Sequence, residues 1–180
     1  MTRRLALLII CIVTLARGAD AGDELIVNGD FEDGVNGWRQ FWARSGDGSA
    51  QVFSDGAKHG KAAIEIKYGG SADWSFQQAT PLNVAPGDLY ELSGWIRMEG
   101  EGSATLSVVL YDGQQNAISW SYGGRTVAAT GSDIGPWRKV RSRFVVPDGC
   151  RTLIPRLMGS GAARVQLDNS SLVKTGTLEQ

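Results

Sequence analysis

Short apolar segments separated by turn residues follow one another along almost the whole chain. Within most segments, hydrophobic and polar side chains alternate with a period of two, the pattern of strands with one buried face. The segments predicted as strands are Leu25–Asn28, Phe41–Arg44, Ala50–Phe53, Ala62–Tyr68, Phe76–Val84, Leu89–Met98, Ala104–Tyr111, Ile118–Tyr122, Lys139–Val146, Leu153–Met158 and Arg164–Val173. Pairs such as Gly69-Gly70 and Asp112-Gly113 separate them as tight turns. No segment shows a convincing helical period, so the pattern predicts an all-β sandwich or barrel.

The alternation also predicts which side chains face the interior. In Ala62–Tyr68, Ile64 and Ile66 share one face, and Glu65 and Lys67 share the other. Proline cannot donate a backbone hydrogen bond to a neighbouring strand. Pro155 therefore predicts that its strand lies at a sheet edge or carries a bulge.

The N-terminus has the pattern of a secretory signal peptide. Arg3 and Arg4 precede the apolar run Leu5–Leu15, which is too short for the roughly 20 residues of a membrane span. Small residues then offer cleavage between Gly18 and Ala21, so residues 1–21 are predicted to be removed. The mature protein is expected to be secreted, either extracellular or periplasmic. Residues 24–175 are expected to form one domain, since the chain has only 180 residues.

Composition and charge exclude several classes of protein. The formal net charge is −1, which gives no electrostatic attraction for nucleic acid. A single histidine excludes a three-histidine zinc site. Cys150 is the only cysteine left after cleavage, so no disulfide can form within the chain, and it is expected to pack as a small apolar residue. We expect a monomer that neither binds nucleic acid nor spans a membrane.

Three groups of motifs, in a fixed order, point to one family. They are Leu25-Ile26-Val27-Asn28-Gly29-Asp30-Phe31-Glu32 with Gly37-Trp38; His59-Gly60-Lys61 with Pro86-Gly87-Asp88-Leu89-Tyr90-Glu91-Leu92-Ser93-Gly94-Trp95; and Pro136-Trp137-Arg138-Lys139-Val140, Pro147-Asp148-Gly149 and Val165-Gln166-Leu167-Asp168-Asn169. Together they resemble the CenC-type carbohydrate-binding modules of families 4, 9, 16 and 22. The resemblance extends over nearly all of 24–174.

This resemblance implies a jelly-roll, galactose-binding-like β-sandwich of about ten antiparallel strands in two sheets. It implies a non-catalytic module that binds a polysaccharide or oligosaccharide, such as xylan or β-glucan, in a cleft on one concave sheet. Such modules are usually attached to glycoside hydrolases, whereas this sequence has no room for a catalytic domain beside the module.

The resemblance further implies a structural calcium ion, Ca²⁺, between the N-terminal motif and the last strand. Calcium prefers carboxylate and carbonyl oxygens, and Asp30, Glu32 and Asp168 supply carboxylates. By family position, the carbonyl near Lys58 would add a ligand. Asn169 stands where many relatives have a second aspartate. The alternative is that Asp30 and Glu32 are ordinary turn and capping acids.

Aromatic residues are divided between the core and the cleft. Trp38, Trp95 and Trp137 are predicted to belong mainly to the core. Trp74, Trp120 and Tyr122 are predicted to line the cleft, because an aromatic ring can stack on the apolar face of a sugar. The residues predicted to bond the sugar hydroxyls are Arg156, Gln78 and Arg125. The alternative is that Trp74 and Trp120 cap the edges of the core.

Two other functions remain open at this point. A small glycoside hydrolase or lyase would need a pair of carboxyls across a cleft, and only Glu65, Glu91 and Asp73 could provide one. A cell-surface sandwich that binds proteins would instead expose an aromatic patch without hydroxyl-bonding partners.

Overall fold

The computed structural model describes residues 22–128 and 131–178, so the predicted signal peptide, 1–21, lies outside the described residues. The described residues form eleven strands and no helix, and none of them belongs to a helix that could cross a membrane. The strands are β1 Trp42–Ala43, β2 Gly48–Phe53, β3 Ala63–Tyr68, β4 Asp73–Gln77, β5 Leu82–Asn83, β6 Asp88–Gly100, β7 Ser103–Tyr111, β8 Ala117–Ala128, β9 Arg138–Val145, β10 Thr152–Ser160 and β11 Ala163–Thr177. The predicted all-β fold class is confirmed.

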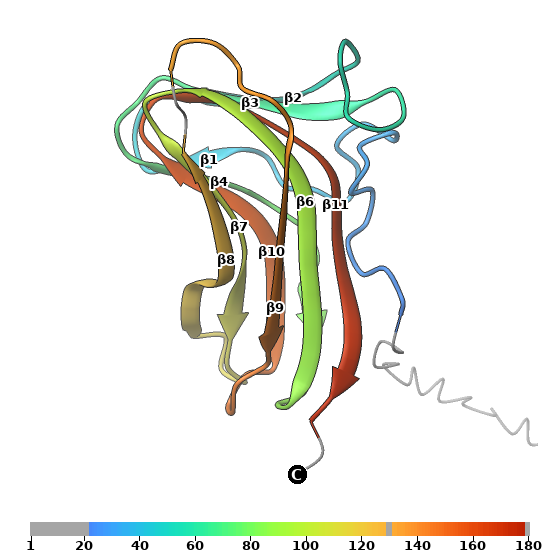
Figure 1. Ribbon diagram of the computed structural model, residues 1–180. Coiled ribbons are helices and arrows are strands. Elements are labelled where there is room, and N and C mark those ends of the chain that lie inside the picture. The colour runs from blue at the N-terminus through green and yellow to red at the C-terminus, as the bar shows by residue number, and fades with distance from the viewer. Residues whose placement is uncertain (1–21, 129–130, 179–180) are drawn as a thin grey trace, which may run out of the picture.

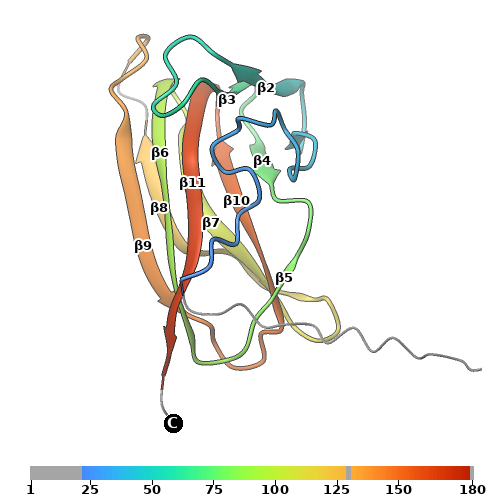
Figure 2. The ribbon, with the colours of Figure 1, turned by 90° about the vertical axis from the view of Figure 1, so that its right-hand side faces the viewer.

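Two sheets face each other in a sandwich (Figures 1 and 2). One sheet, which we name the front sheet, has the order β1-β4-β10-β7-β8, and β5 also pairs with β10. The back sheet has the order β2-β3-β11-β6-β9. Every ladder is antiparallel, and the C-terminal strand β11 lies between β3 and β6. The predicted jelly-roll sandwich is confirmed.

The core lies between the sheets and follows from strand alternation. On β6, Leu92 and Ile96 point inward and are at most 1% exposed, and Leu106 on β7 meets them from the front sheet at 1%. On β3, Ile64 is fully buried and Lys67 is exposed, as the alternation predicts. Burial of these aliphatic side chains supplies the main stabilisation of the fold.

The predicted first strand, Leu25–Asn28, does not form. Glu24, just before this segment, forms an isolated bridge with Val173, and the Leu25 N–H donates to the Leu172 carbonyl at 2.9 Å. The Glu24 carboxylate accepts a hydrogen bond from the Ile26 backbone N–H at 2.8 Å. Asn28 adopts a left-handed conformation with φ of 51°. A side-chain hydrogen bond and a left-handed residue thus replace the extended backbone that the apolar pattern indicates.

Pro155 was predicted to mark an edge strand or a bulge. The edge alternative is wrong, because β10 lies between β4 and β7, and the ladders of β10 with these two strands contain no bulge. The predicted strand Phe76–Val84 is interrupted, and its two parts, β4 and β5, pair with different ends of β10. Pro155 lies opposite the interruption, where its carbonyl accepts a hydrogen bond from the Gln78 N–H at 3.0 Å. A residue in an antiparallel ladder directs N–H and C=O to the same neighbour. The lack of an N–H at Pro155 therefore costs no ladder hydrogen bond, because this side of β10 faces the interruption between β4 and β5.

Candidate functional site

The exposed face of the front sheet is hollowed into a cleft of about 930 Å³. Residues of β1, β4, β7, β8 and β10 line it, together with the segment that precedes β1. Alternation along β4 places Asp73, Ser75 and Gln77 on the cleft side. The floor is therefore polar, and its side chains come from adjacent strands held by backbone hydrogen bonds.

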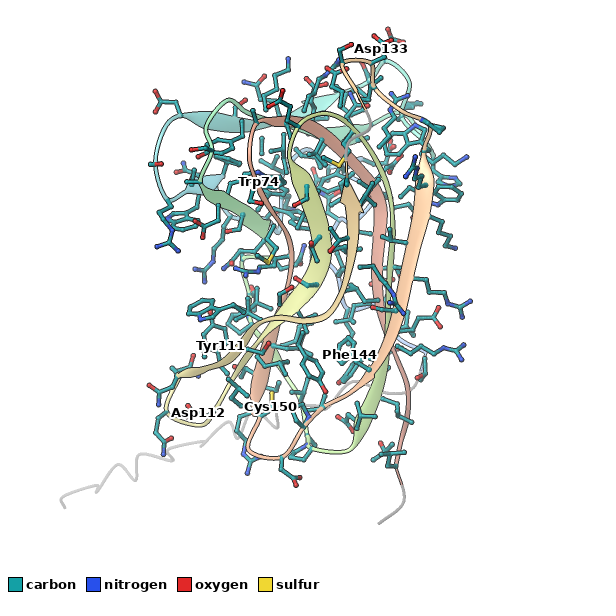
Figure 3. All side chains as sticks on the ribbon, turned by 60° about the vertical axis from the view of Figure 1, so that its left-hand side comes forward. Trp74, Tyr111, Asp112, Asp133, Phe144 and Cys150 are labelled. Atoms are coloured by element: carbon teal, nitrogen blue, oxygen red, sulfur yellow. The ribbon has the colours of Figure 1, made fainter. Side chains whose placement is uncertain are left out.

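Two tryptophans with exposed rings stand at opposite edges of this cleft. Trp42 on β1 is 50% exposed and Trp120 on β8 is 62% exposed. Four strand spacings separate β1 from β8, about 19 Å along the sheet at about 4.8 Å per spacing. Tyr111, at the end of β7 (Figure 3), lies edge-on to Trp120 with ring centroids 6.3 Å apart. The cleft thus offers flat apolar surfaces at both ends.

Arg156 connects the floor of the cleft to the Trp120 edge. Its side chain rises from β10, is 8% exposed, and donates a hydrogen bond to the Trp120 carbonyl. The guanidinium carbon lies 5.9 Å from the centroid of the Trp120 ring. Burial lowers the pKa of Arg156 from its ordinary value. Two residues predicted from the sequence to share a site, Trp120 and Arg156, are therefore neighbours in the cleft.

Trp74 is not a cleft residue, and its predicted solvent-facing position is wrong. Its side chain is 1% exposed and points between the sheets, where it packs against Phe41 at 6.1 Å between ring centroids. A Cβ built on Gly159 would lie 2.2 Å from the indole ring, so this glycine makes room for it. Trp74 shares the inward face of β4 with Phe76. The polar residues before Trp74 led to the prediction of an exposed side chain, although Trp74 and Phe76 lie on the same face of the strand.

The other predicted hydroxyl and stacking partners also lie outside the cleft lining. Gln78 is 3% exposed and is bonded to both the N–H and the carbonyl of Val27. Tyr122 packs edge-on against Phe144, at 5.7 Å, and donates from its hydroxyl to a β9 carbonyl. Arg125 is exposed and donates to a β9 carbonyl as well. Irregular register between β7 and β8 breaks the simple alternation that placed Tyr122 beside Trp120.

Sequence reasoning missed several residues that line the cleft. They are Trp42, Tyr111, Arg39, Arg44 and Gln77. Trp42 lies in a strand of only two residues, so alternation gave little information about its direction. Its neighbour Phe41 contacts Tyr68 and Trp74, and this indicates that consecutive aromatic residues here face opposite sides.

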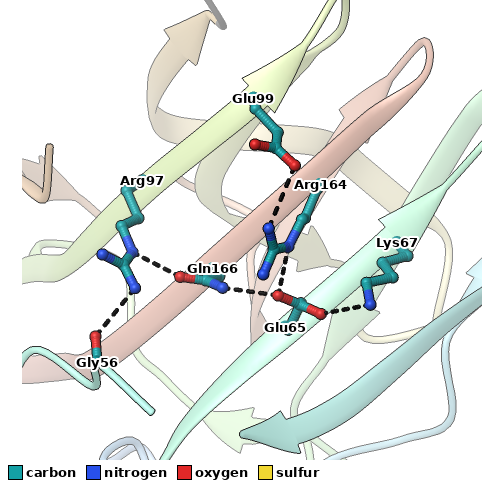
Figure 4. Close-up of polar contacts among 7 residues, drawn as sticks. All are labelled: Gly56, Glu65, Lys67, Arg97, Glu99, Arg164 and Gln166. Atoms are coloured by element: carbon teal, nitrogen blue, oxygen red, sulfur yellow. Dashed lines mark hydrogen bonds and ion pairs between the residues drawn. The ribbon is translucent and has the colours of Figure 1, made fainter. Parts of the chain in front are cut away.

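The exposed face of the back sheet carries a network of paired charges (Figure 4). Glu65 accepts hydrogen bonds from Arg164 at 2.6 Å and Gln166 at 2.7 Å, and it pairs with Lys67 at 2.8 Å. Burial opposes ionisation of Glu65, but these three contacts outweigh it and lower its pKa to about 2. On β6 and β9, Glu91 pairs with two arginines, and their hydrogen bonds lower its pKa.

This pairing bears on the three carboxylates weighed as catalytic groups. Glu65 and Glu91 lie on the back sheet, whereas Asp73 lies in the cleft of the front sheet. Hydrogen bonds from Arg44 lower the pKa of Asp73. A glycosidase acid has a raised pKa and a second carboxyl across the same cleft. The three residues do not meet that requirement.

Only one of the three tryptophans predicted for the core belongs to it. Trp38 is 7% exposed and stacks on Phe76 at 4.9 Å. Trp95 lies on the outward face of β6, half-buried, with the Lys58 ammonium 4.3 Å from its ring centroid. Trp137 is half-buried beneath the Arg97 guanidinium at 4.6 Å. Family position gave no sign that Trp95 points outward from β6. The alternation along β6 does indicate it, because Trp95 lies on the face opposite to Leu92 and Ile96.

The residues predicted for calcium lie around the loop 58–62. Asp168 is fully buried, and its Oδ2 accepts hydrogen bonds from the N–H groups of Lys58 and His59 at 2.7 and 2.8 Å. Glu32 accepts from two further N–H groups of this loop, which lower its pKa. Lys58 therefore contacts Asp168 through its backbone N–H and not through its carbonyl. Asp30 is exposed.

One atom in this region fits a bound cation. Oδ1 of Asp168 is buried and has no hydrogen-bond partner. Burial raises the pKa of Asp168, although the N–H donors at Oδ2 oppose that effect. A cation would supply the missing partner. Within the described residues, however, no three acidic, histidine or cysteine side chains cluster closely enough to hold a metal by themselves.

Comparison with known proteins identifies the class that this fold and cleft define. A family model described as a carbohydrate binding domain matches residues 23–159. The chain therefore belongs to this family of carbohydrate-binding domains. The predicted resemblance to CenC-type modules is confirmed, and so is the prediction of a binding module and not an enzyme. Curated proteins give no significant match.

Solved structures with the same fold include carbohydrate-binding modules and a domain of a phage tailspike protein. The CBM22-1 xylan-binding domain of Paenibacillus barcinonensis Xyn10C is 18% identical, with a TM-score of 0.57 over 89% of this chain and 100% of that one. TmCBM61 in complex with β-1,4-galactotriose is 19% identical, with a TM-score of 0.56 over 84% and 99%. The enzymatically active domain of bacteriophage CBA120 tailspike protein 4 is 15% identical, with a TM-score of 0.65 over 83% of this chain but only 21% of that one. At these sequence identities, the structural similarity establishes the fold alone.

Proposed function

We propose that the protein binds a polysaccharide or oligosaccharide in the front-sheet cleft, with Trp42 and Trp120 stacking on sugar rings. The observation that carries this proposal is the pair of exposed indole rings at opposite edges of one cleft. A sugar ring has an apolar C–H face that fits an aromatic ring, while its hydroxyls need polar partners. Ser75 and Gln77 on the floor supply such partners.

The length of the cleft favours a chain of sugars over a single one. About 19 Å along the sheet separates the strands that carry the two tryptophans. The similar solved structures include a xylan-binding domain and a complex with β-1,4-galactotriose. By analogy with the ligands of these modules, xylan or a β-glucan-like chain is the ligand class that we propose here.

The polar surroundings of the aromatic residues favour a glycan over a protein partner. A protein-binding patch would be contiguous and apolar. In the cleft, Trp42 is instead accompanied by Arg39, Arg44 and Asp73, which offer hydrogen bonds to hydroxyl groups. A protein-interaction sandwich is therefore not a second proposal, and absence of binding to every oligosaccharide in the test below would favour it.

The test is calorimetric titration of the wild type, Trp42→Ala and Trp120→Ala with xylo-oligosaccharides, β-glucan oligosaccharides and β-1,4-galactotriose. Each variant should lose about 1–3 kcal/mol of binding free energy, because one stacking ring is removed. Its melting temperature should stay within a few degrees of wild type, since both rings are exposed. Trp137→Ala is the matched control and should bind as wild type. Loss of binding in Trp137→Ala alone would place the ligand on the back sheet.

We further propose that a structural calcium ion binds at Asp168 and Glu32. The orphaned Oδ1 of Asp168 supports this assignment. A bound cation would stabilise the folded state by mass action, so a chelator should lower the melting temperature and added calcium should restore it. Asp168→Asn should abolish the calcium response. An unchanged melting curve in chelator, with no metal by elemental analysis, would rule the ion out.

We also propose secretion through the signal peptide at 1–21. The basic start and short apolar run support it. N-terminal sequencing of the exported protein should give a start between Ala19 and Gly22. A cytoplasmic protein that retains Met1 would contradict it.

A further inference from the structure

The floor of the cleft contains a buried cation without an acidic partner. Arg156 is 8% exposed, and within the described residues no carboxylate lies within ion-pair distance of it. Its guanidinium contacts the Trp120 carbonyl and the Met158 sulfur, the latter at 3.1 Å, and its Nε has no partner. Arginine stays protonated at neutral pH. A buried positive charge is therefore held in the cleft without a salt-bridge partner.

The charged residues around Arg156 are mostly basic, and Asp73 is the one acidic residue in the cleft lining that attracts its charge. Among the residues that line the cleft, Arg39, Arg44 and Arg156 are basic, and only Asp73 is acidic. Asp73 is already engaged, since Arg44 donates to both its carboxylate oxygens at 2.5 and 2.9 Å. The cleft thus carries net positive charge, although the chain as a whole is at −1.

A buried guanidinium without a salt bridge is unfavourable unless a ligand or another group pairs with it. Burial of a charge without a partner is unfavourable by several kcal/mol in general. Ser107 lies opposite Arg156 in the β7–β10 ladder, and its buried hydroxyl has no partner either. Two neighbouring polar groups on this side of the front sheet therefore lack hydrogen-bond partners, and of the two only Arg156 lines the cleft.

We infer that the cleft selects a glycan that carries carboxylates, that is, one containing uronic acid residues, and that Arg156 pairs with the carboxylate. This inference rests on the proposed function and specifies its ligand class. Arginine presents a planar fork of donors that matches a carboxylate in two parallel hydrogen bonds. Trp42 and Trp120 are placed to stack on flanking sugar rings, while the exposed Arg39 adds attraction at the rim.

Matched pairs of ligands test this inference on the whole protein. One pair is a glucuronic-acid-substituted xylo-oligosaccharide and the same molecule with its carboxyl reduced to an alcohol. The other is an oligogalacturonate and its methyl ester. The acidic member of at least one pair should bind about ten-fold tighter or more, the value of a hydrogen bond to a charged group. That preference should shrink when salt rises from about 0.05 M to about 0.5 M.

Variants assign the preference to Arg156. Arg156→Gln should lose the discrimination between acidic and neutral members, because it should weaken the acidic member about ten-fold more than the neutral one. Arg156→Lys should keep part of the discrimination. Arg143→Gln, which removes an exposed charge from the back sheet, is the control and should change neither. If Arg156→Gln fails to fold, the ligand pairs and the salt dependence of the wild type decide.

Different failures point to different conclusions. Equal affinity for both members of each pair, or a preference for the neutral members, overturns the uronate inference and leaves the proposed function standing. An Arg156→Gln variant that weakens acidic and neutral members equally also overturns it, because Arg156 would then position Trp120. Absence of binding to all four ligands and to the neutral oligosaccharides overturns both proposals.

Discussion

The exposed faces of the two sheets carry the same kinds of side chain in different states of pairing. On the back sheet, Glu65 is bonded by three neighbours, and Trp95 is covered by a lysine ammonium. On the front sheet, Arg156 has no carboxylate partner, and Trp42 and Trp120 have exposed rings. Tryptophans and arginines therefore do not mark a ligand site by their presence. What distinguishes the front sheet is that Arg156 has no salt bridge and that two tryptophans are at least half exposed.

The largest expected effect separates the buried from the exposed tryptophans. Trp74→Ala should lower the free energy of unfolding by about 3–5 kcal/mol, because it empties a fully packed position. Trp42→Ala should lower it by less than about 1 kcal/mol. Chemical denaturation of the two variants measures both values. A stable Trp74→Ala variant that no longer binds glycan would return Trp74 to the ligand site.

A smaller effect tests whether the back-sheet network is structural. The pKa of Glu65 is lowered from an ordinary value of 4.5 to about 2. A carboxyl with a lowered folded-state pKa contributes stability above pH 4.5 and loses it as the pH falls towards about 2. The wild type should therefore lose more stability across this interval than Glu65→Gln does. Parallel slopes in pH-dependent melting curves would show that the network contributes nothing.

The smallest effect is expected for an exposed ion pair on the same face. The Arg143 side chain is 70% exposed and shares Glu91 with Arg141. Arg143→Gln should change the free energy of unfolding by less than about 1 kcal/mol, because solvent screens the pair and Glu91 keeps its other partner. Glycan affinity should not change. Weaker binding in this variant would extend the ligand site to the back sheet.

Much of the fold was predictable from the sequence because strand alternation is a local signal. The burial of Ile64 and the exposure of Lys67 follow from period two alone. The interruption opposite Pro155 was not predictable, because it depends on which strands pair with β10. Tertiary pairing of this kind is set by contacts between residues distant in the sequence.

The site was predictable in part for the same reason. Trp120 was assigned to the cleft from its serine-rich segment and family position, and Arg156 as a residue that bonds sugar hydroxyls. The structure places both residues in the cleft lining. Trp74 was misassigned because polar neighbours outweighed its shared parity with Phe76. Gln78 was misassigned because its partner, Val27, lies 51 residues away in the sequence. Residues whose partners are distant give no local sign of whether they are free to bind a ligand.

The most direct test of the cleft uses the six tryptophans as reporters. Their indole N–H signals are recorded by nuclear magnetic resonance on isotope-labelled protein during titration with the oligosaccharide that binds tightest in calorimetry. Single Trp→Phe variants assign the signals. The account predicts that the signals of Trp42 and Trp120 shift as ligand is added, while those of Trp95 and Trp137 stay in place. Shifts at Trp95 and Trp137 with none at Trp42 and Trp120 would contradict it and move the binding site to the back sheet.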